Sequence, residues 1–209
     1  SMRPKLVIGF AAETDNLDEN AIKKLSNKNC DWIIANDVSK NNCGFDSDYN
    51  EVVIHYKDTK KQKEKLSFKK KSEISEEIVD RIINQISYLL REIGINLNTS
   101  PVLDLKVKNT TKIIGDRAFS SNINIVNKIG NLVIEKFHYN KIGTVIKHIP
   151  GHGLAKSDSH IRTPYVYKNL NYLKRNDFKV FKNKKSVFAM TAHIIFSKID
   201  PTNTVTHSK

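Results

Sequence analysis

The chain has 209 residues, of which 39% are hydrophobic, and this content argues against extensive disorder. No apolar run approaches the roughly 20 residues that cross a bilayer, which argues against a membrane span. Its net charge of +13 comes from 29 lysines and only 6 arginines, and arginine is the residue favoured for bidentate recognition of bases and phosphates, so the composition argues against nucleic acid as a partner. Cys30 and Cys43 form no CxxC or Cys/His motif and the opening residues lack a signal-peptide layout, so we expect no disulfide, no metal site and a cytoplasmic location.

The first part of the chain is typical of a parallel α/β layer. Residues 5–10 form a short apolar run, which predicts a strand buried on both faces. A helix should follow, because Asp15 or Asn16 can cap it and apolar residues then recur at every fourth position. Residues 32–35 predict a second strand. The order strand, helix, strand favours a parallel sheet.

The middle of the chain predicts a hairpin and then a long helix. Residues 52–56 and 66–68 resemble two strands joined by a lysine-rich turn. From Ser72 onward the apolar residues change to helical spacing, and Gly94 is a suitable stop. We therefore expect one helix of about 21 residues, and because no glycine-rich or proline-rich linker occurs, any domain boundary should lie inside or beside it.

The last part of the chain alternates again between strand and helix patterns. The predicted elements are an extended segment at 97–105, a helix at 123–137, a strand at 144–149, a helix at 170–181 and a strand at 186–194. This alternation favours a second α/β segment with parallel strands.

Three motifs in the first segment carry a resemblance to a known family. They are GFAAETDN, KKLSNKNCDWIIANDVS and GFDSDYN, in order and at family-like spacing. These residues resemble the C-terminal part of phosphopantothenoylcysteine synthetase, the ligase half of the bifunctional coenzyme A biosynthesis protein, which activates a carboxylate with CTP. The resemblance implies a Rossmann-like sheet, with Phe10 beside the nucleotide and Lys24 and Lys28 in contact with it. CTP is therefore the expected ligand of this segment.

The residues alone leave other interpretations open. Lys24 and Lys28 lie on one helix face and are often simply solvated lysines, Phe10 by itself would be a core residue, and Asn36 and Asp37 would end a strand in a turn. The family carries its catalytic lysine and early strands upstream of the first motif, so the resemblance implies that the ligase reaction is absent.

Four motifs in the second segment resemble another family. They are GINLNTSPVLDL, IGDRAFSS, IKHIPGHGLAKSDSH and FAMTAHI. Together they resemble the β-N-acetylhexosaminidases of glycoside hydrolase family 3, which remove N-acetylglucosamine during cell-wall recycling and fold as a (β/α)8 barrel with the active site at the C-terminal ends of the strands. The ligand implied by this resemblance is a sugar that contains N-acetylglucosamine.

The resemblance assigns roles to five residues of the second segment. Arg117, Lys147 and His148 become sugar-binding residues. Asp158 and His160 become a general acid/base dyad, in which the carboxylate fixes the imidazole tautomer and raises the basicity of its other nitrogen. A lone strand-end lysine or histidine, or an isolated DxH, would more often be structural.

Two more residues of this segment have an open role, and the catalytic set is expected to be incomplete. Asp104 and His193 either line the site or are buried structural polar groups, while Gly151 and Gly153 let the intervening loop bend. The family's nucleophile is an aspartate on a later strand, expected beyond Lys209, so hydrolysis should be vestigial at most.

The two resemblances together predict the architecture. We expect an α/β chain in which a partial Rossmann-like parallel sheet (1–86) is joined through the long helix to a partial (β/α)8 barrel (87–209). Incomplete sheets leave unpaired strand edges, so a homo-oligomer is expected. Three functions remain open: a hexosaminidase-like chain that is inactive alone, a CTP-binding remnant of the ligase, and a silent fusion product. No cofactor is expected.

Overall fold

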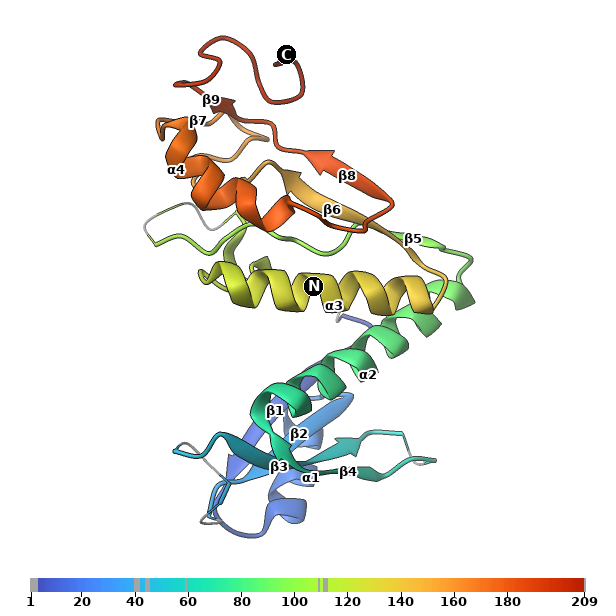
Figure 1. Cartoon of the computed structure of the whole chain (residues 1–209). Coiled ribbons are helices and arrows are strands. Elements are labelled where there is room, and N and C mark those ends of the chain that lie inside the picture. Colours follow the sequence, from blue (N-terminus) through green and yellow to red (C-terminus); the bar gives the residue numbers. More distant parts are fainter. Residues whose placement is uncertain are drawn as a thin grey trace. The chain divides into compact units, whose positions relative to one another are not determined.

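The chain folds into two compact units that divide inside its longest helix. The computed structural model describes residues 4–39, 42–43, 46–58, 60–108, 110 and 113–208. The first unit ends at Ile78 and the second begins at Val79, both within helix α2 (Lys71–Glu92; Figure 1). We expected a boundary inside or beside this helix and set it after residue 86, and that position stays a prediction.

The first unit contains a four-stranded mixed sheet. Its elements are β1 (Ile8–Glu13), α1 (Leu17–Asn27), β2 (Trp32–Asp37), β3 (Tyr49–Tyr56), β4 (Lys63–Lys70) and the first part of α2. The strand order is β1-β2-β3-β4, in which β1 and β2 are parallel and the two remaining pairs are antiparallel. The predicted strand, helix, strand unit and the predicted hairpin are therefore both present. Gly44 and Phe45 of the third motif lie outside the described residues.

Helix α1 covers one face of this sheet. Its buried Ala21 and Leu25 pack on Ala11 of β1 and on Ile33 and Ala35 of β2. The i, i+4 spacing in the sequence produces this contact, because residues four apart lie on one helix face.

The boundaries of β1 and α1 differ from the sequence expectation. Strand β1 continues to Glu13, which pairs with Asp37 of β2, because backbone pairing does not require apolar side chains. The helix begins after Asn16 as expected, but Asn16 is left-handed, with a φ of 44°, and its side chain makes no capping hydrogen bond. Asparagine tolerates this conformation better than most residues.

Helix α2 belongs to both units and confirms the long helix expected between Ser72 and Gly94. Ile74, in its first part, is buried. Its second part packs against helix α3 (Ile123–Tyr139) and the turn that follows, where the buried side chains include Ile83, Phe137 and Ile142. Within the part of the chain that the structure describes, no helix is long and apolar enough to cross a membrane.

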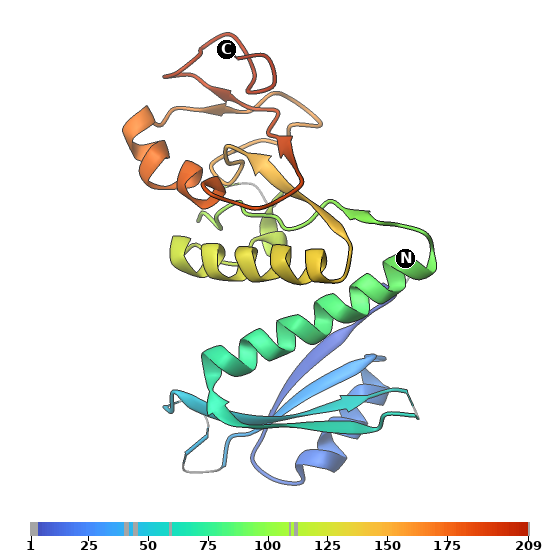
Figure 2. The ribbon, with the colours of Figure 1, turned by 45° about the vertical axis from the view of Figure 1, so that its right-hand side comes forward.

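The second unit is built on parallel strands. Its elements are the rest of α2, β5 (Leu97–Asn98), η1 (Gly115–Arg117), α3, β6 (Gly143–Ile149), β7 (Tyr165–Val166), α4 (Leu170–Arg175), η2 (Asp177–Phe181), β8 (Phe188–Thr191) and β9 (Ile195–Phe196). Strands β5, β6 and β8 form one sheet, all parallel, and β7 and β9 form a separate parallel pair. Figure 2 shows α3 lying along one face of the three-stranded sheet. Parallel strands covered by helices are the expected parts of a (β/α)8 barrel.

Two predicted elements of the second unit are shorter than expected. The helix expected at 170–181 is α4 followed by the short helix η2, with a break at Asn176, whose φ and ψ are −119° and −96°. The strand expected at 186–194 ends at Thr191, because β8 pairs with β6 whereas β9 pairs with β7. In both cases the pattern of apolar residues extends beyond the point at which the observed element ends.

Candidate functional site

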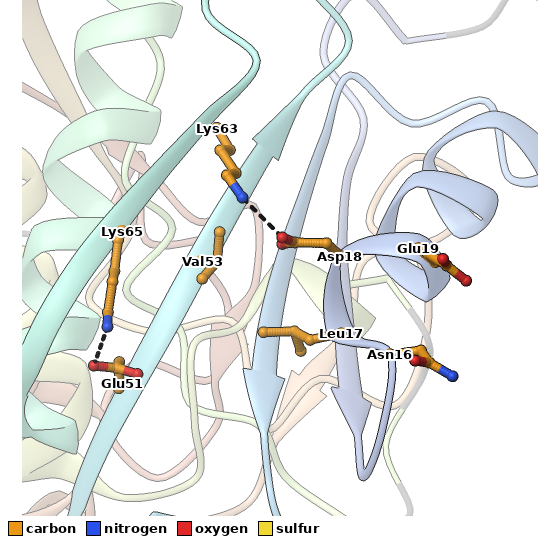
Figure 3. A pocket seen from close by; sticks show the side chains of 8 residues that line it. All are labelled: Asn16, Leu17, Asp18, Glu19, Glu51, Val53, Lys63 and Lys65. Atoms are coloured by element: carbon orange, nitrogen blue, oxygen red, sulfur yellow. Dashed lines mark hydrogen bonds and ion pairs between the residues drawn. The ribbon is translucent and has the colours of Figure 1, made fainter.

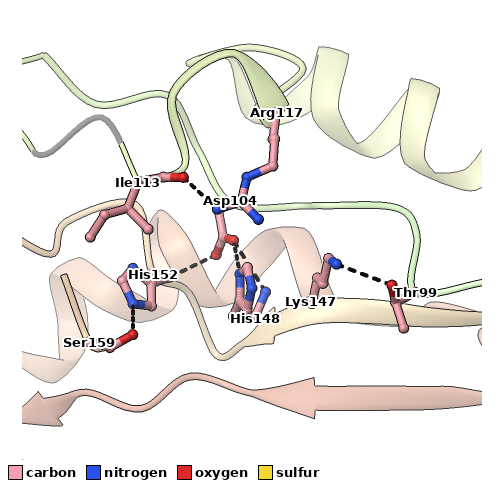
Figure 4. Close-up of polar contacts among 8 residues, drawn as sticks. All are labelled: Thr99, Asp104, Ile113, Arg117, Lys147, His148, His152 and Ser159. Atoms are coloured by element: carbon pink, nitrogen blue, oxygen red, sulfur yellow. Dashed lines mark hydrogen bonds and ion pairs between the residues drawn. The ribbon is translucent and has the colours of Figure 1, made fainter. Parts of the chain in front are cut away.

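The strongest cluster of polar side chains in the second unit lies at the C-terminal end of β6 (Figure 4). Lys147 and His148 directly precede Ile149, the last residue of this strand, and the chain then turns at Pro150. The ends of parallel strands are where (β/α)8 barrels place their ligand-binding groups. Strand β6 therefore carries Lys147 and His148 near its C-terminal end, as the sequence pattern predicted, and their sugar-binding role stays a prediction.

Asp104 lies at the centre of this cluster and is completely buried. Its Oδ1 accepts a hydrogen bond from the backbone N–H of His152 (2.7 Å), and its Oδ2 accepts one from the backbone N–H of His148 (3.2 Å). The same Oδ2 lies 2.6 Å from His148 Nδ1. With Nδ1 donating to the carboxylate, Nε2 of His148 is the nitrogen left for a ligand. Asp104 thus holds the ring of His148 and the backbone of His148 and His152 in position.

Two cations lie close to this centre. Lys147 Nζ donates to Thr99 Oγ1 over 3.4 Å, and the Arg117 guanidinium donates to the Ile113 carbonyl (Figure 4). Partial burial, and secondly the charge of Arg117, lower the pKa of Lys147, while Asp104 opposes this shift. The structure thus places Lys147, His148 and Arg117 around the buried carboxylate of Asp104 (Figure 4). The position of Lys147 and His148 near the end of β6 was expected from the sequence motif there.

The loop after β6 is held tightly by its two glycines. Gly151 has a φ of 142°, and a Cβ there would lie 2.8 Å from Asp177 Cβ. A Cβ on Gly153 would collide with the Leu105 carbonyl oxygen. The predicted tight bend is therefore present, and it brings the buried His152 onto Asp104.

Asp158 and His160 form the pair that their spacing predicted. Asp158 Oδ1 accepts from the His160 backbone N–H (2.9 Å) and lies 2.8 Å from His160 Nδ1. These hydrogen bonds, the backbone one first, lower the pKa of Asp158. His160 is 87% exposed, so its Nε2 faces solvent. The loop is linked to the buried cluster through Ser159 Oγ, which lies 3.4 Å from His152 Nε2.

His193 is not joined to this cluster by a hydrogen bond. It is exposed after β8, and its Nδ1 lies 3.3 Å from Thr206 Oγ1. Sequence reasoning missed Asp177, whose buried Oδ1 has no hydrogen-bond partner among the described residues. Burial, and to a lesser degree the charge of Asp104, raise the pKa of Asp177 to about 6. Its position directly before Phe178, Val180 and Phe181 is a sequence signal that could have indicated its burial.

The three residues expected to bind a nucleotide are not among the described residues that line a cavity of the first unit. Phe10 is 69% exposed on β1, so the interpretation of Phe10 as a core residue is wrong. Lys24 is ion-paired with Glu13, and Lys28 is exposed at the end of α1. No hydrogen bond or ion pair in the described part of the chain joins the three residues.

A cavity of about 690 Å³ in the first unit is lined by residues of α1, β3 and β4 (Figure 3). Four of its charged groups are paired, because Lys63 Nζ lies 2.7 Å from Asp18 Oδ2 and Lys65 Nζ lies 2.8 Å from Glu51 Oε2. The lining contains neither Phe10 nor a lysine of α1. The predicted nucleotide contacts and this cavity are therefore separate features. Among the described residues, no group of three or more His, Cys, Asp and Glu side chains is arranged to hold a metal.

Two protein-family models match this chain, one over the second unit and the end of the first, the other over the first unit and the start of the second. Residues 61–209 match the family model of the glycosyl hydrolase family 3 N terminal domain, which is more than half of the chain. The chain belongs to glycosyl hydrolase family 3. Residues 1–86 match a second model, the DNA/pantothenate metabolism flavoprotein C-terminal domain. The chain is thus a fusion of the two predicted families, and the matches share β4 and most of α2.

Relatives of this family 3 chain are longer β-hexosaminidases. A β-hexosaminidase from Idiomarina loihiensis is 36% identical over 114 residues, which cover 54% of this chain and 34% of the relative. The solved structure of NagZ from Neisseria gonorrhoeae in complex with N-trifluoroacetyl-D-glucosamine matches with a TM-score of 0.57 and 27% identity, over 61% of this chain and 38% of NagZ. The solved structure of a family 3 β-N-acetylglucosaminidase from Paenibacillus sp. also matches with a TM-score of 0.57, over 62% of this chain and 25% of that enzyme. The chain spans about a third of the length of these relatives.

Proposed function

We propose that the second unit carries the sugar-binding and acid/base part of a β-N-acetylglucosaminide hydrolase site. The observation that carries the proposal is the pairing of Asp158 with His160 through two hydrogen bonds of 2.8 and 2.9 Å, in a unit that belongs to glycosyl hydrolase family 3. Relatives in this family are named as hexosaminidases, which supports an N-acetylglucosamine-containing substrate.

The proposed roles follow from these contacts. Asp158 holds the hydrogen on His160 Nδ1, so that the exposed Nε2 can give a proton to the leaving glycosidic oxygen and later accept one from the attacking water. Lys147 and Arg117 donate hydrogen bonds to sugar hydroxyl groups, and His148 presents Nε2 to the ligand because Asp104 engages its Nδ1.

We infer that the chain alone turns over substrate slowly or not at all. A retaining glycosidase also needs a carboxylate nucleophile opposite the acid/base. Asp104 cannot serve, because it is completely buried and its two oxygens are engaged by His148 and His152. The proposed activity of the chain is therefore sugar binding, with residual hydrolysis at most.

Binding of N-acetylglucosamine should depend on Lys147. We expect the sugar to raise the unfolding temperature of the wild-type chain, because a ligand that binds only the folded state stabilises it. Lys147→Met keeps the aliphatic stem but removes the donor, so the shift should disappear, while Lys198→Met, at an exposed lysine, should keep it.

Any hydrolysis of an aryl N-acetylglucosaminide should fall by about 10²–10⁴-fold in His160→Ala. Robust hydrolysis that persists in His160→Ala would contradict the assigned role.

A second candidate function is CTP binding by the first unit. It is favoured by the match of residues 1–86 to a pantothenate-metabolism domain and by the exposed ring of Phe10, which is available to stack on a base. We expect CTP to raise the unfolding temperature of the wild-type chain and to have no such effect on Phe10→Ala. Tyr139→Ala removes another exposed ring, from the second unit, and should leave the CTP shift intact. An equal CTP shift in Phe10→Ala would exclude this site.

We also propose that the chain forms homo-oligomers in the cytoplasm. Strands β5 and β8 are the edges of their sheet, and their side chains Leu97, Phe188 and Met190 are 40–58% exposed. Exposed apolar edge strands favour pairing between copies. The free thiols of Cys30 and Cys43 suit a reducing compartment. Size-exclusion chromatography with light scattering should give a mass of at least 48 kDa, twice that of the 23.9 kDa chain, whereas a stable monomer would refute the oligomer.

A further inference from the structure

The net charge of the chain is confined to one of its two units. Residues 1–78 contain 14 basic and 14 acidic residues, whereas residues 79–209 contain 21 basic and 8 acidic residues. The first unit is therefore neutral, and the whole charge of +13 belongs to the second unit. Such an asymmetry between halves is typical of a unit that meets a polyanion.

A cavity of about 810 Å³ in the second unit gathers part of this charge. We call this cavity the basic groove. The described residues that line it include Lys108, Lys156, Arg162 and Lys168, and no aspartate or glutamate is among them. Within the described part of the chain none of these four side chains forms an ion pair, unlike Lys63 in the first unit. The charge of Lys168 also acts on the carboxyl of Asp177. Four cations gathered around one cavity still create a positive potential that an anionic ligand would relieve.

Three tyrosines also line the basic groove. The rings of Tyr165 and Tyr167 are stacked, with centroids 6.4 Å apart and planes 22° apart, and Tyr167 is 69% exposed. The Lys168 ammonium lies 4.8 Å from the centroid of the Tyr172 ring. Exposed aromatic faces beside cations are suited to a ligand that has flat rings as well as negative charges.

We propose that the basic groove binds single-stranded nucleic acid, with bases stacked on Tyr165 and Tyr167 and phosphates neutralised by the surrounding cations. Stacking on aromatic side chains tolerates any base, and lysine neutralises phosphate as a point charge, so binding does not require base-specific arginine contacts. The low arginine content that argued against nucleic acid therefore excludes sequence readout but not this mode of binding. The proposal is independent of sugar hydrolysis, because Asp158 and His160 do not line the groove.

The test is fluorescence anisotropy of a labelled 12-nucleotide oligo(dT) with the full chain. Four phosphate contacts predict that log K falls with log salt concentration with a slope of about −3. Tyr167→Ala should weaken binding about tenfold or more, because stacking contributes substantially per base, while Tyr167→Phe should keep it. Tyr139→Ala, at an exposed tyrosine outside the groove, is the matched control. Arg162→Ala should reduce the slope by about 0.7, while Lys198→Ala should leave it unchanged.

Competitors distinguish nucleic acid from other polyanions. Polyphosphate supplies phosphates without rings, and polygalacturonate supplies carboxylates on sugar rings. At equal charge concentration, we expect each to displace the oligonucleotide at least tenfold less effectively than unlabelled oligo(dT). No binding at low salt, equal binding by Tyr167→Ala, or equal displacement by either polymer would overturn the proposal.

Discussion

Asp104→Asn should destabilise the second unit by about 1–3 kcal/mol, because the amide cannot accept at both of its ends. Asp104 accepts from two backbone N–H groups and the imidazole of His148, all at a position with no solvent exposure. An asparagine must present its NH2 group to one of these donors and so leaves a buried N–H without an acceptor. Asp104→Ala should cost more, about 3–5 kcal/mol, as does removal of one partner of a buried pair.

The matched control is Asp158→Asn. Asp158 has the same kind of contacts, to a backbone N–H and a histidine Nδ1, but its partner His160 is exposed. Water replaces most of the lost contacts there, so the urea midpoint should fall far less than in Asp104→Asn. Urea unfolding followed by circular dichroism measures both variants. Equal midpoints for wild type and Asp104→Asn would show that Asp104 does not hold the site together.

The Asp104 variant should also change the histidine that faces the ligand. Loss of the Asp104 acceptor removes the reason for His148 to carry its hydrogen on Nδ1. We expect the ¹⁵N chemical shifts of the His148 ring to move toward the other tautomer in Asp104→Asn and to stay unchanged in Asp158→Asn. A purely structural role of Asp104 would not require this change.

Local patterns in the sequence predict the elements well. Helix α2 and helix α3 follow from apolar spacing, and the contact between Asp158 and His160 follows from their i, i+2 separation. Each of these features depends on residues that are neighbours along the chain. The motif around Lys147 and His148 likewise predicted a strand end, and β6 ends there.

The polar centre of the site could not be predicted from local patterns. Asp104 is 44 residues from His148 and 48 residues from His152. Its contacts therefore depend on how β6 packs against the extended segment that contains Val102 and Asp104. The same holds for Asp177, whose burial depends on the loop at Gly151. Lys24 was expected to contact a nucleotide, and its ion pair with Glu13 depends on the extension of β1 beyond the apolar run.

The buried carboxyl of Asp177 should make the second unit less stable as the pH rises. Burial raises the pKa of Asp177 from 3.8 to about 6, and the charge of Asp104 adds to the effect. Between these two values the folded chain keeps the proton that the unfolded chain has released, so the free energy of unfolding falls with increasing pH. A difference of about two pKa units corresponds to about 3 kcal/mol, lost in full above pH 6.

Asp177→Asn should therefore stabilise the chain at pH 7.5 by up to about 3 kcal/mol and have little effect at pH 4, where the aspartate is neutral in the folded state. The amide keeps the shape of the side chain without a charge to bury. Asp200→Asn is a control of opposite sign, because hydrogen bonds from Asn203 lower the pKa of Asp200, so its removal should destabilise the chain at neutral pH. Urea unfolding at both pH values measures the difference in the free energy of unfolding between Asp177→Asn and the wild type. A difference that is the same at pH 4 and pH 7.5 could not arise from a titrating carboxyl.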